Sequence, residues 1–436
     1  MKPINVGLLG IGTVGGGTFT VLKRNAEEIA RRAGRPIQIT VVADKNLELA
    51  KAVTAGACRL TDDAFSVVSD PEIDIVVELI GGCGIAKELA LKAIENGKHV
   101  VTANKALLAS HGNEIFAAAQ KKGVMVAFEA AVAGGIPIIK ALREGLTANR
   151  IEWIAGIING TTNFILSEMR DKGLSFATVL QEAQRLGYAE ADPTFDVEGV
   201  DAAHKLSIMS AIAFGNSMNF DKAHIEGISR LEAADIKYAE QLGYRIKLLG
   251  ITKRTPEGVE LRVHPTLIPA KRLIANVEGA MNAVLVKGDA VGATLYYGKG
   301  AGAEPTASSV IADLVDVTRM HTADPGQRVP HLAFQPNAMV DLKILPLSEV
   351  ITSYYLRLRV EDKPGVLADI TRILADQQIS IDAMIQREPA EGEEQTDIII
   401  LTHQTREMNI DAAIVKIEAL TAVKGKLTRL RLEELL

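Results

Sequence analysis

The feature that most constrains the fold of this chain is a glycine-rich turn close to its start. The apolar run at 4–9 predicts a buried strand, Gly10-Ile11-Gly12-Thr13-Val14-Gly15 follows it directly, and a helical pattern then extends to about residue 33. Such a turn is tight at its first glycine, open to a pyrophosphate at its second and closely packed at its third. The context predicts a dinucleotide-binding turn, with contacts from Gly10, Gly12, Thr13, Val14 and Gly15; the alternative is a glycine-rich turn with a purely structural role.

The rest of the first 130 residues alternates short apolar runs with stretches of helical periodicity. This alternation is typical of an α/β fold with a parallel sheet. Further strands are predicted at 37–43, 73–79, 99–102 and 124–131, with helices between them. We expect a Rossmann-like dinucleotide-binding domain over 1–136, completed by 303–320.

Two regions of different character follow. Residues 137–302 mix predicted strands with long helices, which indicates a mixed α+β domain. Residues 321–350 contain four prolines and are predicted to be a linker. Residues 351–436 show a βαββαβ order, which predicts a ferredoxin-like domain.

Composition narrows the class of protein. Acidic residues number 54 and basic residues 48, so the net charge is −6, and no Lys/Arg run suggests nucleic acid or an anionic membrane as a partner. The two cysteines, Cys58 and Cys83, are too few for a disulfide framework and favour a reducing cytoplasm. The chain enters a strand-like run at once, without a signal peptide, and has no apolar stretch long enough for a membrane span. We therefore expect a soluble cytoplasmic protein.

The residues after the second predicted strand bear on the choice of dinucleotide. An acidic residue at this point bonds the ribose 2′-hydroxyl of NAD, whereas a cation accepts the 2′-phosphate of NADP. The chain offers both types, Asp44 and Lys45, with Arg59 as a further cation. These residues leave NAD and NADP as open alternatives.

Reduction of a carbonyl by a dinucleotide also needs a proton donor. None of the seven tyrosines begins a Tyr-x-x-x-Lys pattern, and two cysteines disfavour a catalytic zinc. Cys83 lies near a predicted strand end, in Gly81-Gly82-Cys83-Gly84, but no histidine partner is evident. We interpret Cys83 as a small residue that fills space in the fold and not as a thiol nucleophile.

The segment 187–205 offers a different proton donor. Glu190, Asp196 and Asp201 precede Lys205, and the last two are four residues apart, which places them on one face of a helix. The run 206–214 is apolar nearly all round and predicts a buried helix. A lysine at the head of such a helix is suited to move a proton. The spacing alone leaves an ordinary surface ion pair as the alternative.

At these residues the chain resembles homoserine dehydrogenases of the long, monofunctional bacterial type, which end in an ACT domain. The matching segments are 10–15, 102–108, 129–137, 156–163, 187–205 and 300–307. The resemblance implies reduction of L-aspartate 4-semialdehyde to L-homoserine by NADH or NADPH, in threonine, methionine and isoleucine biosynthesis. It also implies that 137–302 serves catalysis and dimerisation, and that the chain forms a homodimer or homotetramer.

The resemblance further implies roles for individual residues. Lys205 would donate the proton to the aldehyde oxygen, oriented by Asp201, and Lys105 would lie between nicotinamide and substrate. Glu190 would hold the substrate ammonium, and Asp196 would bond the substrate or brace the lysine.

Two loops complete the implied site. The loop 129–137 resembles a monovalent-cation loop of the family, which implies Na⁺; the residues alone indicate only a glycine-rich, proline-ended loop that crosses between domains. The ligands would be the Glu129 side chain and the carbonyls of Val132, Gly134 and Ile136. Gly302, in the turn 300–307, would pack against the cofactor from the far side.

The chain departs from the family pattern at two places. The family commonly has Gly-Gly-x-x-Pro-Ala where this chain has Gly81-Gly82-Cys83-Gly84-Ile85-Ala86, so we expect a looser loop beside the nicotinamide. Ala43 stands where many relatives have an arginine, which weakens the case for NADP over NAD.

The turn at 360–370 resembles the ACT-domain turn between the first strand and the first helix. Pro364 sets the turn, and Gly365 leaves backbone N–H groups at the helix start for an amino-acid carboxylate. The implied effector is L-threonine, as a feedback inhibitor; the alternative is an oligomerising domain without a ligand.

Two other functions fit these residues less well than the dehydrogenase. A non-catalytic sensor of nucleotides and amino acids has no need for a lysine flanked by carboxylates. An aspartate-semialdehyde dehydrogenase would need a Cys/His pair, which this chain lacks.

Overall fold

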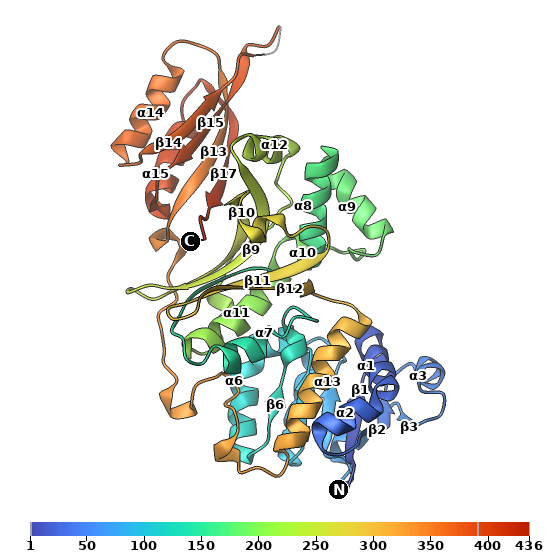
Figure 1. The fold of residues 1–436 in the computed structure, drawn as a ribbon. Coiled ribbons are helices and arrows are strands. Elements are labelled where there is room, and N and C mark those ends of the chain that lie inside the picture. The colour runs from blue at the N-terminus through green and yellow to red at the C-terminus, as the bar shows by residue number, and fades with distance from the viewer. Residues whose placement is uncertain (1, 390–391, 436) are drawn as a thin grey trace. The chain divides into compact units, whose positions relative to one another are not determined.

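The structure is a computed structural model that describes residues 2–389 and 392–435. The chain divides into two compact units, each assembled from separate stretches (Figure 1). The first unit takes in Met1–Gly160, Asp201–Ala223 and Ala280–Leu342, and the second takes in Thr161–Val200, His224–Gly279 and Lys343–Leu436. None of the described helices is long and apolar enough to cross a membrane.

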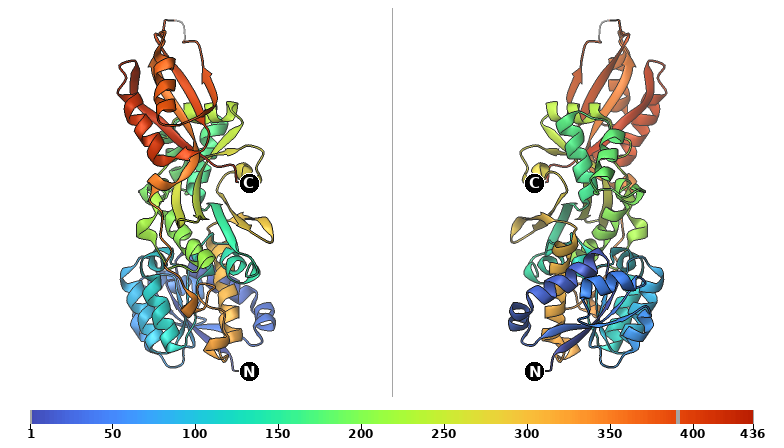
Figure 2. Two further views of the ribbon diagram at one scale, coloured as in Figure 1. Left: turned by 90° about the vertical axis from the view of Figure 1, so that its left-hand side faces the viewer. Right: turned by 90° about the vertical axis from the view of Figure 1, so that its right-hand side faces the viewer.

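The core of the first unit is a parallel sheet with helices on both faces (Figure 2). Its described strands lie in the order β3-β2-β1-β4-β5-β6, the doubly wound order of dinucleotide-binding folds. The strands are β1 (Ile4–Leu9), β2 (Ile37–Ala43), β3 (Arg59–Thr61), β4 (Ile75–Glu78), β5 (His99–Thr102) and β6 (Val126–Ala127). The predicted fold class is confirmed. Strand β3 escaped prediction because it is a three-residue edge strand that begins with an exposed arginine.

The helices around this sheet differ from the prediction at one point. The single helix predicted to run to about residue 33 is wrong, because Asn25 has non-helical dihedrals and separates α1 (Thr13–Arg24) from α2 (Ala26–Ala33). The other helices on the sheet are α3 (Leu47–Thr54), α4 (Ala64–Ser69), α5 (Gly84–Glu95), α6 (Lys105–Lys122) and α13 (Ala303–Met320). Helix α13 returns from late in the chain to pack on α1, so closely that a Cβ on Gly17 would lie 2.5 Å from the Ala303 carbonyl oxygen.

The first unit also contains a buried helix. Helix α11 (Val200–Phe214) is buried at every residue from Asp201 to Phe214, as its apolar sequence predicts. An antiparallel group of strands belongs to the same unit and consists of β7 (Ile151–Ile157), β11 (Met281–Gly288) and β12 (Gly292–Lys299). Short helical turns lie at Glu129–Ala131, α7 (Ile138–Lys140) and Ala141–Gly145. Residues 321–350, all described, form three short 3-10 turns, at Pro325–Gln327, Pro336–Ala338 and Leu347–Glu349, and two isolated β-bridges, at Val340 and Ile344.

The second unit contains the ferredoxin-like module, whose predicted βαββαβ order is confirmed. Its elements are β13 (Ile351–Glu361), α14 (Val366–Asp376), β14 (Ile381–Gln386), β15 (Gln395–Thr402), the two-residue β16 (Thr405–Arg406), α15 (Glu407–Glu418) and β17 (Val423–Leu432). The last strand, β17, pairs with β13 inside the module and also, in parallel, with β10 (Val259–Pro269). The other elements of the unit are α8 (Gly160–Lys172), α9 (Phe176–Arg185), α10 (Thr194–Val197), β8 (His224–Ile225), α12 (Ala233–Gln241) and β9 (Tyr244–Arg254).

Candidate active site

The predicted pair of Asp201 and Lys205 lies in the first two turns of α11. Lys205 Nζ is 2.6 Å from Asp201 Oδ2, and it also donates to the carbonyl oxygen of Ile158, 2.8 Å away. The Lys205 side chain is 11% exposed and that of Asp201 is 5% exposed, which excludes the alternative of a surface ion pair. The ammonium group is therefore oriented by two acceptors and largely removed from bulk water.

A second lysine meets the same carboxylate. Lys105, the first residue of α6, places its Nζ 3.1 Å from Asp201 Oδ1, and its side chain is 36% exposed. Asn159, just after β7, donates from Nδ2 to Asp201 Oδ2 at 2.9 Å. The structure thus brings together the three residues predicted for catalysis, and each Asp201 oxygen faces one lysine.

The charge state of Asp201 follows from this arrangement. Burial raises the pKa of the Asp201 carboxyl, but the positive charges of Lys205 and Lys105 outweigh it, with hydrogen bonds from Lys205 and Asn159. The net effect holds the pKa of Asp201 well below its usual range. The Asp201 carboxylate is therefore ionised at neutral pH and supplies a negative charge between the two ammonium groups.

A buried hydrogen-bond network sets the position of Lys105. Asn104 caps α6 by accepting the Leu107 N–H at 3.1 Å, and its own N–H donates to Thr102 Oγ1 at 3.0 Å. Thr102 in turn donates to Glu78 Oε2 at 2.8 Å, and Glu78 is fully buried at the end of β4. Helix α6, and with it Lys105, begins at a point determined by the ends of two neighbouring strands.

The same network holds the loop that lacks the family's proline. Glu78 Oε1 accepts the N–H groups of Ile80 and Gly81 at 2.9 and 3.3 Å, and Asn104 Nδ2 donates to the Gly82 carbonyl at 2.7 Å. Three hydrogen bonds therefore anchor the start of this loop without a proline. From Gly84 onwards the segment is the first turn of α5, so only Gly81, Gly82 and Cys83 form a loop. The expected looseness itself stays a prediction.

The glycine turn has the features that a pyrophosphate requires. Gly10 has φ +92°, and a Cβ on Gly15 would lie 2.0 Å from the Gly10 carbonyl oxygen, so neither position accepts a side chain without strain. A Cβ on Gly12 would meet no atom within 4 Å, and this open residue caps α1 without a side-chain hydrogen bond. The turn therefore fits a dinucleotide pyrophosphate at the N-terminus of α1, beside Thr13 and Val14.

The residues predicted to choose between NAD and NADP have protein partners of their own. Asp44 accepts the Ile11 N–H through Oδ2 at 2.7 Å and the Asn46 N–H through Oδ1 at 2.8 Å. Lys45 donates to the Asp62 carbonyl at 2.8 Å, and Arg59 forms an ion pair with Asp70 at 2.5 Å. This geometry leaves both dinucleotides open, because all three groups must exchange or extend their contacts to reach a ribose.

Two predicted substrate residues belong to the second unit. Glu190 is exposed, and Asp196 is half-buried in α10. Thr161 at the start of α8 bonds both Asp196 Oδ2, at 3.3 Å, and the Tyr188 carbonyl, at 2.7 Å, so it ties the segment 188–196 to α8. Their predicted roles toward a substrate stay predictions.

The predicted cation loop is rigidly held. The two Glu129 oxygens accept the N–H groups of Ile139 and Lys140, each at 2.8 Å, and the Glu129 N–H donates to Asp313 at 2.7 Å. Burial raises the pKa of the Glu129 carboxyl, opposed by those backbone hydrogen bonds and by nearby cations. Ser309 on α13 donates to the Gly134 carbonyl at 2.6 Å. The predicted ligands, the Glu129 side chain with the carbonyls of Val132, Gly134 and Ile136, would be an all-oxygen set of the type that hard cations prefer, and their role stays a prediction.

In the described part of the chain, no three His, Cys, Asp or Glu residues are grouped so that they could hold a metal ion. Gly302, at φ +124°, caps α13 and stays predicted to border the cofactor. In the C-terminal module Gly365, at φ +93°, precedes α14, and a Cβ there would meet nothing within 4 Å.

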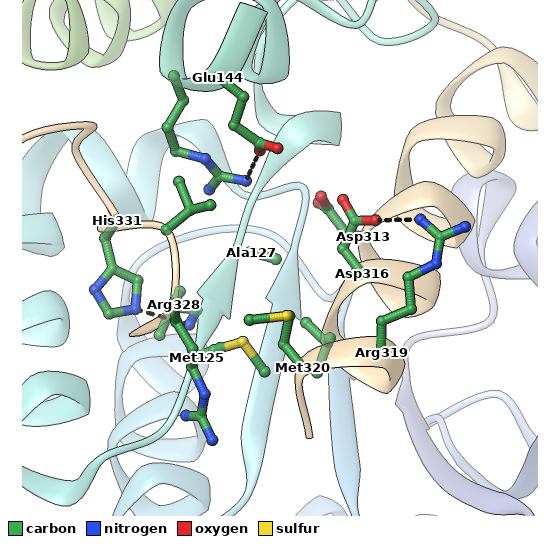
Figure 3. A pocket seen from close by; sticks show the side chains of 13 residues that line it. Met125, Ala127, Glu144, Asp313, Asp316, Arg319, Met320, Arg328 and His331 are labelled. Carbon is green, nitrogen blue, oxygen red and sulfur yellow. Dashed lines mark hydrogen bonds and ion pairs between the residues drawn. The ribbon is translucent and has the colours of Figure 1, made fainter. Parts of the chain in front are cut away.

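A separate cavity of about 200 Å³ lies elsewhere in the first unit, between β6, α13 and the segment 328–331 (Figure 3). Its wall is largely apolar, with the Met125 and Met320 thioethers inside, and Arg328 and His331 on one side. None of the predicted site residues lines it. We therefore do not assign it to the reaction.

A doubly wound sheet with an open glycine turn, and two lysines that share one buried carboxylate, define an NAD(P)-dependent oxidoreductase. Three family models match the chain: "Homoserine dehydrogenase, NAD binding domain" at 10–129, "Homoserine dehydrogenase" at 137–315 and "ACT domain" at 354–421. The chain belongs to the homoserine dehydrogenase family, whose activity is part of amino-acid biosynthesis.

Individual relatives agree with the family models over the full length. A homoserine dehydrogenase from Pseudomonas aeruginosa is 63% identical over 435 residues, and one from Methylobacillus glycogenes is 64% identical, each with complete coverage of both chains. The crystal structure of a homoserine dehydrogenase from Thiobacillus denitrificans is 72% identical, covers 100% of this chain and 99% of its own, and has a TM-score of 0.96. These matches favour this function over the sensor and the aspartate-semialdehyde dehydrogenase considered above.

Sequence reasoning missed several residues of the site. Asn159 was inside a matching segment but carried no role, because only the fold brings it to Asp201. Glu78 lies inside the predicted strand 73–79 and was given no role there. Its signal is a carboxylate in an otherwise buried run, which requires hydrogen-bond donors that the linear pattern cannot name.

Proposed function

We propose that this enzyme reduces L-aspartate 4-semialdehyde to L-homoserine, in the route to threonine, methionine and isoleucine. The observation that carries the proposal is the Lys205–Asp201–Lys105 cluster. The bound reduced dinucleotide supplies the hydride for the aldehyde carbon. Lys205 donates a proton from Nζ to the carbonyl oxygen, and Asp201 orients that ammonium group. Lys105, the more exposed lysine, is placed to contact substrate and nicotinamide.

The substrate is an amino acid, so its ammonium needs an acidic partner. We assign this role to Glu190, with Asp196 as a second polar contact. The cofactor contacts proposed here are Gly10, Gly12, Thr13, Val14 and Gly15 at the pyrophosphate. Lys45 and Arg59 then face the ribose side, and Lys105 and Gly302 face the nicotinamide side.

We propose a division of labour along the chain. Residues 1–136 with 303–320 bind the dinucleotide, 137–302 carry catalysis and dimerisation, 321–350 link, and 351–436 regulate. The loop at Glu129 would bind Na⁺ in a structural role, because the Glu129 side-chain oxygens are held by backbone N–H groups and the ion would take no part in the reaction. The cytoplasmic location expected from the low cysteine content remains part of the proposal.

The C-terminal module would bind L-threonine at the Gly365 turn and act as an inhibitor site. A homodimer or homotetramer is part of the same proposal. Since β17 of this module is already paired with β10, the edge strand β14 is the one that a second module could join within the described sheet.

The test is the initial rate of semialdehyde reduction with NADPH and then with NADH, each with and without threonine. We expect turnover with at least one dinucleotide and a loss of rate with threonine. Sodium chloride replaced by choline chloride tests the cation in the same assay. No turnover with either dinucleotide contradicts the proposed reaction, and a rate insensitive to saturating threonine contradicts only the proposed effector.

A further inference from the structure

An almost completely buried arginine joins the C-terminal module to the rest of the second unit. Arg431 on β17 has a side chain that is 1% exposed. Its Nε donates to Glu407 Oε2 at 2.9 Å and its Nη2 to Glu407 Oε1 at 2.5 Å, within the module. Its Nη1 and Nη2 also donate to the two oxygens of Glu226, each at 2.9 Å. Glu226 lies just after β8 and outside the module, so the arginine holds two separate parts of the chain.

The Glu226 carboxylate is held firmly. Besides Arg431 it bonds His224 Nε2 at 2.7 Å, and Arg429 lies 3.6 Å away. Its backbone N–H donates to the Val263 carbonyl on β10 at 2.8 Å. Burial raises the pKa of Glu226, but hydrogen bonds from His224 and Arg431 hold it well below its usual range. The side chain stays ionised and works as a fixed anchor.

The residues that follow Glu226 pack against the end of the acidic segment. The Ile228 N–H donates to the Val197 carbonyl at 2.8 Å. A Cβ on Gly227 would lie 2.5 Å from both the Val197 carbonyl oxygen and Glu198 Cα. The backbone at 226–228 is therefore in direct contact with the backbone at 197–198.

The segment held in this way carries the proposed substrate contacts. Val197 ends α10 and follows Asp196 directly, and Glu190 lies six residues before Asp196, in the loop that leads into α10. Asp196 is also tied to Thr161, so its position depends on two supports, α8 on one side and the backbone at 226–228 on the other. Glu226 is thus connected to Asp196 through the backbone of 227–228 and Val197.

We propose that Glu226 is a positioning residue for substrate binding, and that Arg431 of the C-terminal module holds it in place. This inference rests on the proposed substrate role of Asp196. The module then supports the substrate segment through the contacts of Arg431 with Glu226. It follows that the module contributes to affinity for the semialdehyde and not to cofactor binding, which belongs to the glycine turn.

The test uses the full-length enzyme with Glu226→Gln, which keeps the shape of the side chain and removes its charge. We expect KM for the semialdehyde to rise about tenfold, with kcat and KM for the dinucleotide within twofold of the parent. Glu260→Gln is the matched control, because Glu260 is also buried and paired, with Arg262, in the same unit. It should leave all three constants within twofold.

Gly227→Ala disturbs the same contact without touching the ion pair, since the new methyl group would press on Val197 and Glu198. It should raise KM for the semialdehyde in the same way, and thermal unfolding of each variant checks that the chain is folded.

The outcomes separate this inference from the function on which it rests. A selective rise in KM for both Glu226→Gln and Gly227→Ala supports the inference. If Asp196→Asn raises KM but Glu226→Gln does not, the positioning role is wrong and the proposed substrate contact stands. If Asp196→Asn leaves KM unchanged, the proposed contact fails and the inference fails with it. Equal effects of Glu226→Gln and Glu260→Gln on every constant would show a general loss of stability and would also overturn it.

Discussion

Replacement of Lys205 by alanine removes the proposed proton donor while leaving its surroundings in place. In the parent chain the ammonium group is 2.6 Å from Asp201 and 2.8 Å from the Ile158 carbonyl. Proton transfer by a positioned side chain contributes about 10²–10⁴-fold to a rate. We therefore expect kcat to fall by about 10²–10⁴, which corresponds to roughly 3–5 kcal/mol of transition-state stabilisation.

The same substitution also costs stability. Removal of one partner from a buried ion pair typically costs about 3–5 kcal/mol, because the other charge is left uncompensated. Here Lys105 remains 3.1 Å from Asp201, and Asn159 still donates to it, so the loss should lie at or below about 3 kcal/mol. The glycine turn is untouched, and dinucleotide affinity should stay near normal.

Three measurements separate these effects: the steady-state rate of semialdehyde reduction, the Kd for the reduced dinucleotide from its fluorescence, and the free energy of unfolding in urea. Lys247→Ala is the matched control. Lys247 is also buried, with its Nζ bound to the Val277 carbonyl at 2.6 Å, but it makes no contact with Asp201 or Lys105 in the described structure. This control should lose comparable stability and keep its kcat.

The reasoning is refuted if Lys205→Ala retains more than about a tenth of the parent kcat while it binds the dinucleotide normally. A loss of rate that Lys247→Ala shows to the same extent would also refute it, since the effect would then follow stability and not proton transfer.

Three further predictions address the cofactor turn, the response to acid and the support of Lys105. Gly12→Ala should raise the Kd for the dinucleotide at least tenfold and leave the Tm unchanged, whereas Gly15→Ala should lower the Tm. The reason is that only the methyl group at position 15 meets backbone atoms in the free protein. Equal losses of Tm in the two variants would contradict this prediction. Burial lowers the pKa of His331 from 6.5 to about 4, so His331 binds a proton at a higher pH in the unfolded chain than in the folded chain. The folded state therefore has its full stability above pH 6.5 and loses part of it as the pH falls toward 4. In His331→Gln, roughly 3 kcal/mol of this acid-induced loss in the free energy of unfolding should disappear, as measured by urea unfolding at a series of pH values. The prediction is refuted if the free energy of unfolding falls with pH in the variant as steeply as in the parent. Thr102→Val removes the hydrogen bonds that link Glu78 to the start of α6 and should lower kcat several-fold. Thr102→Ser keeps the hydroxyl and should retain the parent kcat. Equal kcat values for the two variants would contradict this role of Thr102.

Local spacing in the sequence was enough for the parts of the site that depend on near neighbours. The strand, glycine turn and helix around Gly10–Gly15 are contiguous, and Asp201 and Lys205 are four residues apart, so each geometry follows from residues that are near neighbours along the chain. The βαββαβ order of the C-terminal module is likewise visible, because each element has its own periodicity.

Only the tertiary structure decided which distant groups share a contact. Lys105 and Asn159 converge on Asp201 because a strand end, a helix start and a buried helix meet there, and no local pattern records that meeting. The same holds for Asp44, whose carboxylate turns to the N–H of Ile11. Packing places these polar groups where each can satisfy a buried partner, and that requirement acts through space and not along the chain.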